Sequence, residues 1–252
     1  MPASYTGYDK YFKVRSLIYA RDVSLATQML PLGLCDTADV KFTETVDRLR
    51  DVRRPGGGSA SVHREIESGE LTLGMREFSP PNMLMGLLAT SSAVVAGSQA
   101  ATDIELRPGE FTPTAHQDIS SVVLTNAAGT TTYVAGTDYD VVEGGIWVRP
   151  GGAISAPETG KIAYSYGAQT LIEAIMHGGK TYELFFSALN VVDNDAPVTT
   201  NIWRARFGPM DTLSLQGGQE HGIMTLKAEI LRDSSKGAGV SQWMRMRLRT
   251  PT

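Results

Sequence analysis

The sequence predicts a mainly β protein: a β-sandwich or barrel with one α-helix, and a small antiparallel β-domain inserted into it. Three observations predict this fold. Apolar and polar residues alternate with period two along most of the 252 residues, few long segments have helical spacing, and short strands with glycine turns gather in residues 103–168. The 42% hydrophobic and 20% charged content is typical of a globular chain. We therefore expect residues 1–102 and 169–252 to form the main domain, and 103–168 the inserted domain.

The first strands of the main domain follow from alternation. Apolar and polar residues alternate between Val40 and Leu49, which predicts one strand. Val62–Glu67 and Glu70–Phe78 read as a hairpin that turns at Ser68-Gly69, because serine and glycine favour tight turns. Leu71, Leu73 and Met75 would then share the buried face.

A long loop, residues 50–60, separates these first strands. It contains three arginines and three consecutive glycines: Arg50, Arg53, Arg54, Gly56, Gly57 and Gly58. Such a loop is long for a hairpin and cannot pack a core of its own. It is either solvated or docks on a neighbouring subunit, and we expect an ordered contact in an assembled state.

One helix is expected at about residues 79–90. Ser79 can cap it, Pro80 suits the first turn because its missing N–H needs no partner there, and apolar residues follow at helical spacing. The apolar stripe, which should lie on a sheet, consists of Met83, Leu84, Leu87 and Leu88. Small and turn-forming residues follow, so 91–102 reads as a linker.

The inserted domain is predicted from closely spaced short strands with glycine turns, a pattern typical of small antiparallel sandwiches or barrels. The expected strands are Ser120–Thr125, Thr131–Ala135, Tyr139–Val142, Ile146–Arg149 and Lys161–Tyr166.

Four alternating strands then complete the main domain: Tyr182–Ala188, Asn201–Gly208, His221–Arg232 and Trp243–Arg249. In the last strand, methionine and leucine alternate with Arg245, Arg247 and Arg249. A row of like charges on one face is either solvated, matched by acidic groups of a partner subunit, or a short nucleic-acid track. We expect subunit contacts.

Charge and motifs argue against catalysis and tight nucleic-acid binding. The net charge is −4, whereas proteins that grip phosphates usually carry a basic excess. The sequence contains no nucleophile elbow, phosphate loop or zinc-binding motif, and its four histidines are scattered singly. We therefore expect no enzyme activity, metal or cofactor. The sequence has no apolar run long enough for a membrane helix, and its N-terminal region is charged, unlike a signal peptide. Its single cysteine, Cys35, is expected to be buried and inert.

These features together resemble bacteriophage major tail tube proteins. The strands up to Phe78, the helix and the strands from Tyr182 to Arg249 follow the layout of that family. The segments Gly136–Arg149 and Lys161–Tyr166 are similar to the small Ig-like or decoration modules of phage structural proteins. The resemblance implies a virion protein, made in the host cytoplasm, that forms hexameric rings stacked into a hollow tail tube. It also implies that the 50–60 loop reaches the adjacent ring or subunit.

The resemblance implies partners as well. Other tail proteins would be the tape measure, the tail terminator and the distal tail protein, and double-stranded DNA would pass through the bore during genome ejection without specific binding. Carboxylates lining the bore would avoid a phosphate grip. The candidates are Glu65, Glu67, Glu70 and Glu77, which on the alternative interpretation decorate a solvated outer face.

Two other classes of function remain open. A tail terminator or head decoration protein would also be rich in β-structure and lack an active site. A carbohydrate-binding module would use Trp147, Trp203 or Trp243 as stacking platforms, although these side chains fit core and interface packing better.

Overall fold

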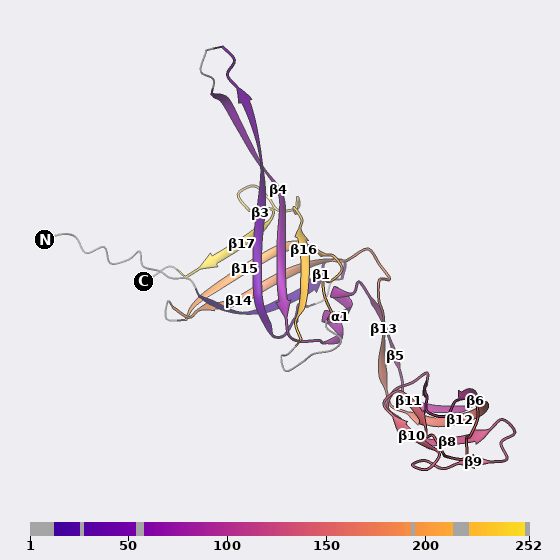
Figure 1. The fold of residues 1–252 in the computed structure, drawn as a ribbon. Helices are drawn as coiled ribbons and strands as arrows, with labels where there is room; N and C mark the ends of the chain where they lie inside the picture. The colour runs from indigo at the N-terminus through magenta and orange to yellow at the C-terminus, as the bar shows by residue number, and fades with distance from the viewer. Residues whose placement is uncertain (1–12, 26–27, 54–57, 193–194, 214–221, 250–252) are drawn as a thin grey trace. The chain divides into compact units, whose positions relative to one another are not determined.

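The computed structural model describes residues 13–25, 28–53, 58–192, 195–213 and 222–249 (Figure 1). The chain divides into two compact units, one formed by Met1–Thr90 with Glu173–Thr252 and the other by Ser91–Ile172. Antiparallel ladders join the strands of both units, which confirms a mainly β fold with a small inserted antiparallel β-domain. In the described ranges, no helix is long and apolar enough to cross a membrane.

The first unit is one eight-stranded sheet in the order β2-β1-β14-β15-β16-β4-β3, with β17 paired to β15. Strand β15 changes partner along its length: residues 198–202 pair with β17 and residues 205–207 with β16. The strands are β1 (Val14–Asp22), β2 (Leu30–Pro31), β3 (Cys35–Arg50), β4 (Ser59–Met75), β14 (Thr181–Asn190), β15 (Ala196–Phe207), β16 (Met224–Ile230) and β17 (Met244–Leu248).

The core of this unit lies on one face of the sheet, as the alternation predicts. The buried rows of β4 and β16 contain Leu71, Leu73 and Met75 opposite Ala228, Leu226 and Met224. Burying one such large side chain contributes about 1.5–3 kcal/mol. In β15, simple alternation over Asn201–Gly208 would bury Trp203 together with Ala205 and Phe207. This expectation is only partly correct, because a register shift opposite Tyr182 and Leu184 makes Ile202, and not Trp203, the buried residue before Ala205.

The predicted turn at Ser68-Gly69 is wrong. Strand β4 runs straight through it and pairs with β3 along nearly its whole length, so the chain turns between residues 50 and 59 instead. Gly69 serves close packing and not a turn: a Cβ there would lie 2.8 Å from Cε1 of Phe42 and 3.0 Å from Cβ of Ile230. Glycine within a strand often marks a close approach or a β-bulge. A bulge does lie next to Ser68, between the pairs Thr43–Ser68 and Glu44–Ile66.

The helix α1 is shorter than expected, running from Pro80 to Gly86. Ser79 occupies the N-cap position, but its side chain makes no capping hydrogen bond. The helix ends before Leu88, whose φ of 50° is incompatible with its continuation. The predicted stripe is therefore wrong in part, because the buried helical residues are Asn82, Met85 and Gly86.

The inserted unit is a small sandwich of two sheets, β6-β12-β8-β9 and β10-β11-β7, around its own core. The predicted strands are confirmed, and β6 and β7 are additional. Their bounds are β6 (Gly97–Leu106), β7 (Phe111–Pro113), β8 (Ile119–Asn126), β9 (Thr132–Tyr133), β10 (Tyr139–Val142), β11 (Gly145–Val148) and β12 (Glu158–Tyr166).

The sequence suggested a linker at residues 91–102, and this prediction is wrong. β5 (Thr90–Val94) pairs with β13 (Gln169–Glu173), and β6 starts at Gly97 and pairs with β12. The compact unit accordingly spans Ser91–Ile172 and is wider than the expected 103–168. The small side chains of Gly97–Thr102 show no apolar alternation, so the sequence does not reveal this strand. Backbone hydrogen bonds, and not apolar side chains, hold it in the sheet.

Candidate interaction surface

The hairpin of β3 and β4 extends well beyond the sheet (Figure 1). Strand β16 pairs with β4 only from Gly69 to Met75, so residues 43–50 and 59–68, here called the arm, form a two-stranded ribbon. All arm residues are exposed except Ser68, which is half-buried. Eight residues at about 3.4 Å each give the arm a length of about 27 Å.

The two faces of the arm differ in polarity. Glu44 pairs with Ile66, Val46 with Arg64 and Arg48 with Val62, so one face presents three aliphatic side chains. Val46, Val62 and Ile66 are 36%, 46% and 48% exposed. The residues paired with them across the ribbon are all charged: Arg64, Arg48 and Glu44. Arg64 forms an ion pair with Glu44 at 3.3 Å on this face.

The opposite face of the arm is polar except at Leu49, which pairs with Ser61 near the tip. Thr45 pairs there with Glu65 and Asp47 with His63, and the imidazole Nε2 of His63 lies 2.9 Å from the carboxylate of Glu65. A ribbon meant for solvent on both sides has no need of an aliphatic face, and an isolated two-stranded ribbon is marginally stable in water. The sidedness of the arm is typical of surfaces that make contacts on their apolar face.

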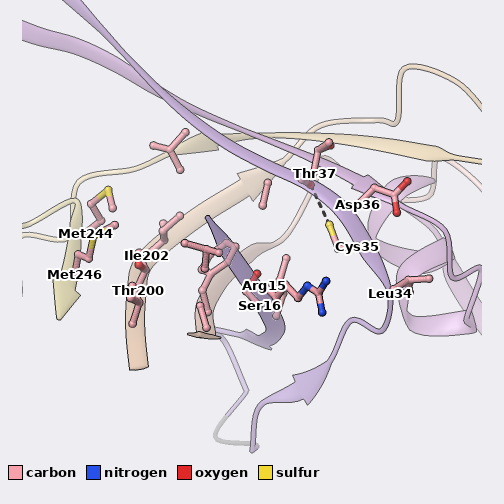
Figure 2. Close-up of a pocket in the computed structure, with 17 residues that line it drawn as sticks. Arg15, Ser16, Leu34, Cys35, Asp36, Thr37, Thr200, Ile202, Met244 and Met246 are labelled. Carbon is pink, nitrogen blue, oxygen red and sulfur yellow. Dashed lines mark hydrogen bonds between the residues drawn. The ribbon is translucent and has the colours of Figure 1, made fainter. Parts of the chain in front are cut away.

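An open apolar groove of about 530 Å³ lies in the same unit (Figure 2). Its walls come from β1, β14, β15, β17 and the start of β3, and they continue the core. The aliphatic and aromatic lining residues are Val14, Ile18, Leu34, Ala38, Val40, Phe186, Ala188, Val198, Ile202, Met244 and Met246. The groove stays open because β2 covers the edge of β1 only at Tyr19 and Ala20, and no described strand pairs with the outer edge of β3.

Cys35 lies in the wall of this groove. It is only partly buried, whereas the sequence predicted a buried thiol. Its Sγ lies 3.0 Å from the carbonyl oxygen of Thr37 and 3.3 Å from that of Gly74, and these two oxygens share the single S–H donor. Burial raises the pKa of this thiol, so little thiolate forms at neutral pH. These contacts agree with a structural thiol.

Three of the four candidate glutamates share the polar face of the hairpin. Glu70 pairs with Lys41 and Glu65 with Thr45, and the Thr45 hydroxyl donates to the Glu67 carboxylate at 2.7 Å. Glu77 lies apart, beyond the end of β4, where its carboxylate accepts a hydrogen bond from the backbone N–H of Leu34. The structure thus brings together Glu65, Glu67 and Glu70 only.

The arginine row lies on the outer side of β17. Arg245 and Lys236 both lie over the indole ring of Trp203, at 5.6 Å and 4.3 Å from its centroid. Arg247 donates to the side-chain oxygen of Asn201 at 3.1 Å, and Arg249 is exposed just after the strand. Within the described ranges no carboxylate pairs with any of the three arginines, so their charges are available to a partner.

The predicted loop at the arm tip is only partly described. Arg50 ends β3, and Arg53 forms an ion pair with Asp51 at 3.0 Å. The backbone N–H of Asp51 donates to the carbonyl of Gly58, at 2.7 Å, across the base of the turn. Arg54, Gly56 and Gly57 lie outside the described residues.

The chain matches, over residues 11–247, a family described as protein of unknown function UCP028589. It belongs to this family. No curated protein matches the chain.

The described part of this UCP028589 protein contains no group of three or more His, Cys, Asp or Glu placed to hold a metal ion. His63 contacts Glu65, His116 stacks on Tyr166 with ring centroids 3.7 Å apart, and His177 lies beside the Ala89 carbonyl. These contacts account for each described histidine, while His221 lies outside the described residues. Sequence reasoning missed the groove and the strand β1 that borders it, although Val14, Ser16, Ile18 and Ala20 do alternate.

Proposed function

We propose that the protein is a structural virion subunit that polymerises with identical copies, as phage tail tube proteins do. Hexameric rings would stack into a hollow tube through which the genome passes. The observation that carries this proposal is the two-stranded arm with one aliphatic face, because that face finds no cover within the described part of its own chain. A contact between two different surfaces of identical subunits closes into a ring or repeats along an axis, depending on the rotation between subunits, and stacking requires the second kind.

Free strand edges support ring closure. The outer edge of β3 presents sixteen residues, Cys35–Arg50, whose outward backbone groups have no strand partner in the described structure. Long open edges are a liability in a monomer and a ready surface for pairing between subunits. The unpaired row of Arg245, Arg247 and Arg249 adds charge for matching an acidic neighbour.

The polar face with Glu65, Glu67 and Glu70 is the proposed bore lining. These carboxylates outnumber Lys41, which pairs with Glu70 on the same face, so the face repels phosphates and gives DNA little of the counterion-releasing grip that a row of lysines or arginines would give. In the assembled tail, the rings would meet the tape measure, terminator and distal tail proteins.

Electron microscopy of the purified protein tests the proposal. Thr43 pairs directly with Ser68, so replacing residues 44–67 by Asn-Gly closes a two-residue hairpin and removes the arm without touching the core. The full chain should form rings and hollow tubes, and the armless variant should still unfold cooperatively on heating, which shows that it is folded, yet form no tubes. Assembly that stops at single rings, without tubes, would indicate a tail terminator instead. A full chain that stays strictly monomeric at high concentration would overturn the proposal.

A further inference from the structure

We propose that the aliphatic face of the arm of one copy docks in the open groove beside Cys35 of another copy. This inference rests on the proposed function and specifies the contact that drives stacking. The two surfaces belong to the same unit of the chain, and each lacks a cover within the described structure.

The arm cannot fill the groove of its own chain. Val40 lies in the groove wall, and the arm begins three residues further along the same strand. From there β3 and β4 run away from the groove as a continuous ladder, so the tip lies about 27 Å beyond the arm's start at about 3.4 Å per residue. Folding it back would break a ladder of paired strands. The occupant is therefore another molecule.

The chemistry of the two surfaces is complementary. Val46, Val62 and Ile66 offer only methyl and methylene groups, and the groove offers aliphatic and thioether side chains, including Met244 and Met246. Methionine adapts its shape to such partners. Arg15 stands at the groove with no described ion pair, and the opposite charge on the arm face is Glu44, which pairs with Arg64 in its own chain and would be shared between Arg64 and Arg15 on docking.

The backbone favours a strand as the occupant. The groove is bordered by the outer edge of β1 from Val14 to Leu17, which has no strand partner in the described structure because β2 begins to pair only at Tyr19. An extended segment entering there gains main-chain hydrogen bonds from an exposed sheet edge in addition to apolar burial. The arm is an extended ribbon, so it fits this opening better than a helix or a compact ligand does.

The single native cysteine gives a direct test, since Cys35 reports from inside the groove. Single cysteines are placed on the arm of the full chain, and assembled protein is treated with a short bis-maleimide at mildly alkaline pH, because burial raises the pKa of the Cys35 thiol. The bis-maleimide bridges thiols that lie too far apart for a disulfide. The aliphatic-face variants are V46C, V62C and I66C, and the matched polar-face controls are T45C, S61C and S68C.

The expected result is a ladder of covalent multimers from the aliphatic-face variants, none from the polar-face controls, and loss of the ladder when Cys35→Ser is added. A ladder that survives Cys35→Ser would mean that arms contact arms, and equal ladders from both faces would mean that the docking face is wrong. Either result overturns the inference, as would tubes that show no crosslink at all. Tubes seen by electron microscopy would leave the proposed function standing in these cases, whereas the absence of any assembly would remove both.

Discussion

The hydroxyl of Thr45 donates a 2.7 Å hydrogen bond to the carboxylate of Glu67, which has no opposite residue on β3. Thr43 pairs with Ser68 and Glu44 with Ile66, so Glu67 is the extra residue of a β-bulge. Bulges bend and twist a strand pair. This one sits where β4 leaves the sheet and becomes the arm, and it therefore sets the direction in which the arm projects.

Deleting Glu67 should redirect the arm without unfolding it. The pairs Thr43–Ser68 and Glu44–Ile66 then become consecutive rungs of a regular ladder, so both faces of the arm keep their residues. Thermal unfolding should be unchanged or slightly improved, while tube formation should be lost because the arm points elsewhere. Circular dichroism and electron microscopy measure the two effects. The conservative control is Glu67→Gln, which keeps the bulge and should still assemble.

Gly69 should tolerate no side chain. In Gly69→Ala the new Cβ would lie 2.8 Å from the Phe42 ring and 3.0 Å from Ile230, inside the sheet. Overpacking of this kind typically costs about 1–3 kcal/mol of unfolding free energy. Denaturant titration of Gly69→Ala against Gly58→Ala, which has nothing within 4 Å, should show the loss only at Gly69. Equal stability of the two variants would refute the close approach.

Unit 2 should lose stability between pH 10 and 12. Burial raises the pKa of Tyr133 from 10.0 to about 12, and the carboxylate of Glu158, which accepts a hydrogen bond from the Tyr133 hydroxyl, adds to this shift. Above pH 10 the unfolded state loses this proton first, so the folded state binds more protons and stability falls until the pH passes the folded value. Thermal scans across this window should show the drop.

The control for this pH dependence is Tyr133→Phe. It should be less stable at neutral pH by about 0.5–1.5 kcal/mol, because a hydrogen bond is lost. Its alkaline drop should be shallower, with the remainder coming from Tyr139, whose pKa burial also raises. An unchanged alkaline slope in Tyr133→Phe would exclude Tyr133 as its source.

Charge reversal at Arg245 and Arg247 should weaken association between subunits. No described carboxylate pairs with either side chain, so the double variant R245E/R247E leaves the ion pairs of the subunit itself intact. Sedimentation at low salt should show less assembly than the native chain, and high salt should narrow the difference because it screens exposed charges. A comparison variant is Arg107→Glu on unit 2, which reverses one charge and breaks the ion pair of Arg107 with Glu105 yet should assemble normally.

Alternation predicted the fold class and most strands of both units, because burial on one face dictates residue type at every second position. It failed where backbone geometry decides: Gly69 reads as a turn but permits a close approach, and the Glu67 bulge leaves no signal in the sequence. The candidate interaction surfaces also differ in whether the sequence alone can reveal them. The arginine row is visible from residue type, whereas the aliphatic face of the arm needs the register of β3 against β4, and the groove needs strands distant in sequence.

The boundaries of the inserted unit can be tested by two deletions that differ only in extent. Removing residues 91–172 takes out the whole compact unit, so the remaining chain should keep its core and form tubes. Removing 103–168 instead leaves the strand residues Gly97–Thr102, whose partners on β12 are then missing. Unpaired backbone of this kind promotes aggregation. The larger deletion should therefore give soluble, assembling protein and the smaller one aggregates, as measured by gel filtration and electron microscopy. The reverse order would show that residues 91–102 belong with the first unit, and unfolding of both variants would show that the sheet of unit 1 depends on the insert.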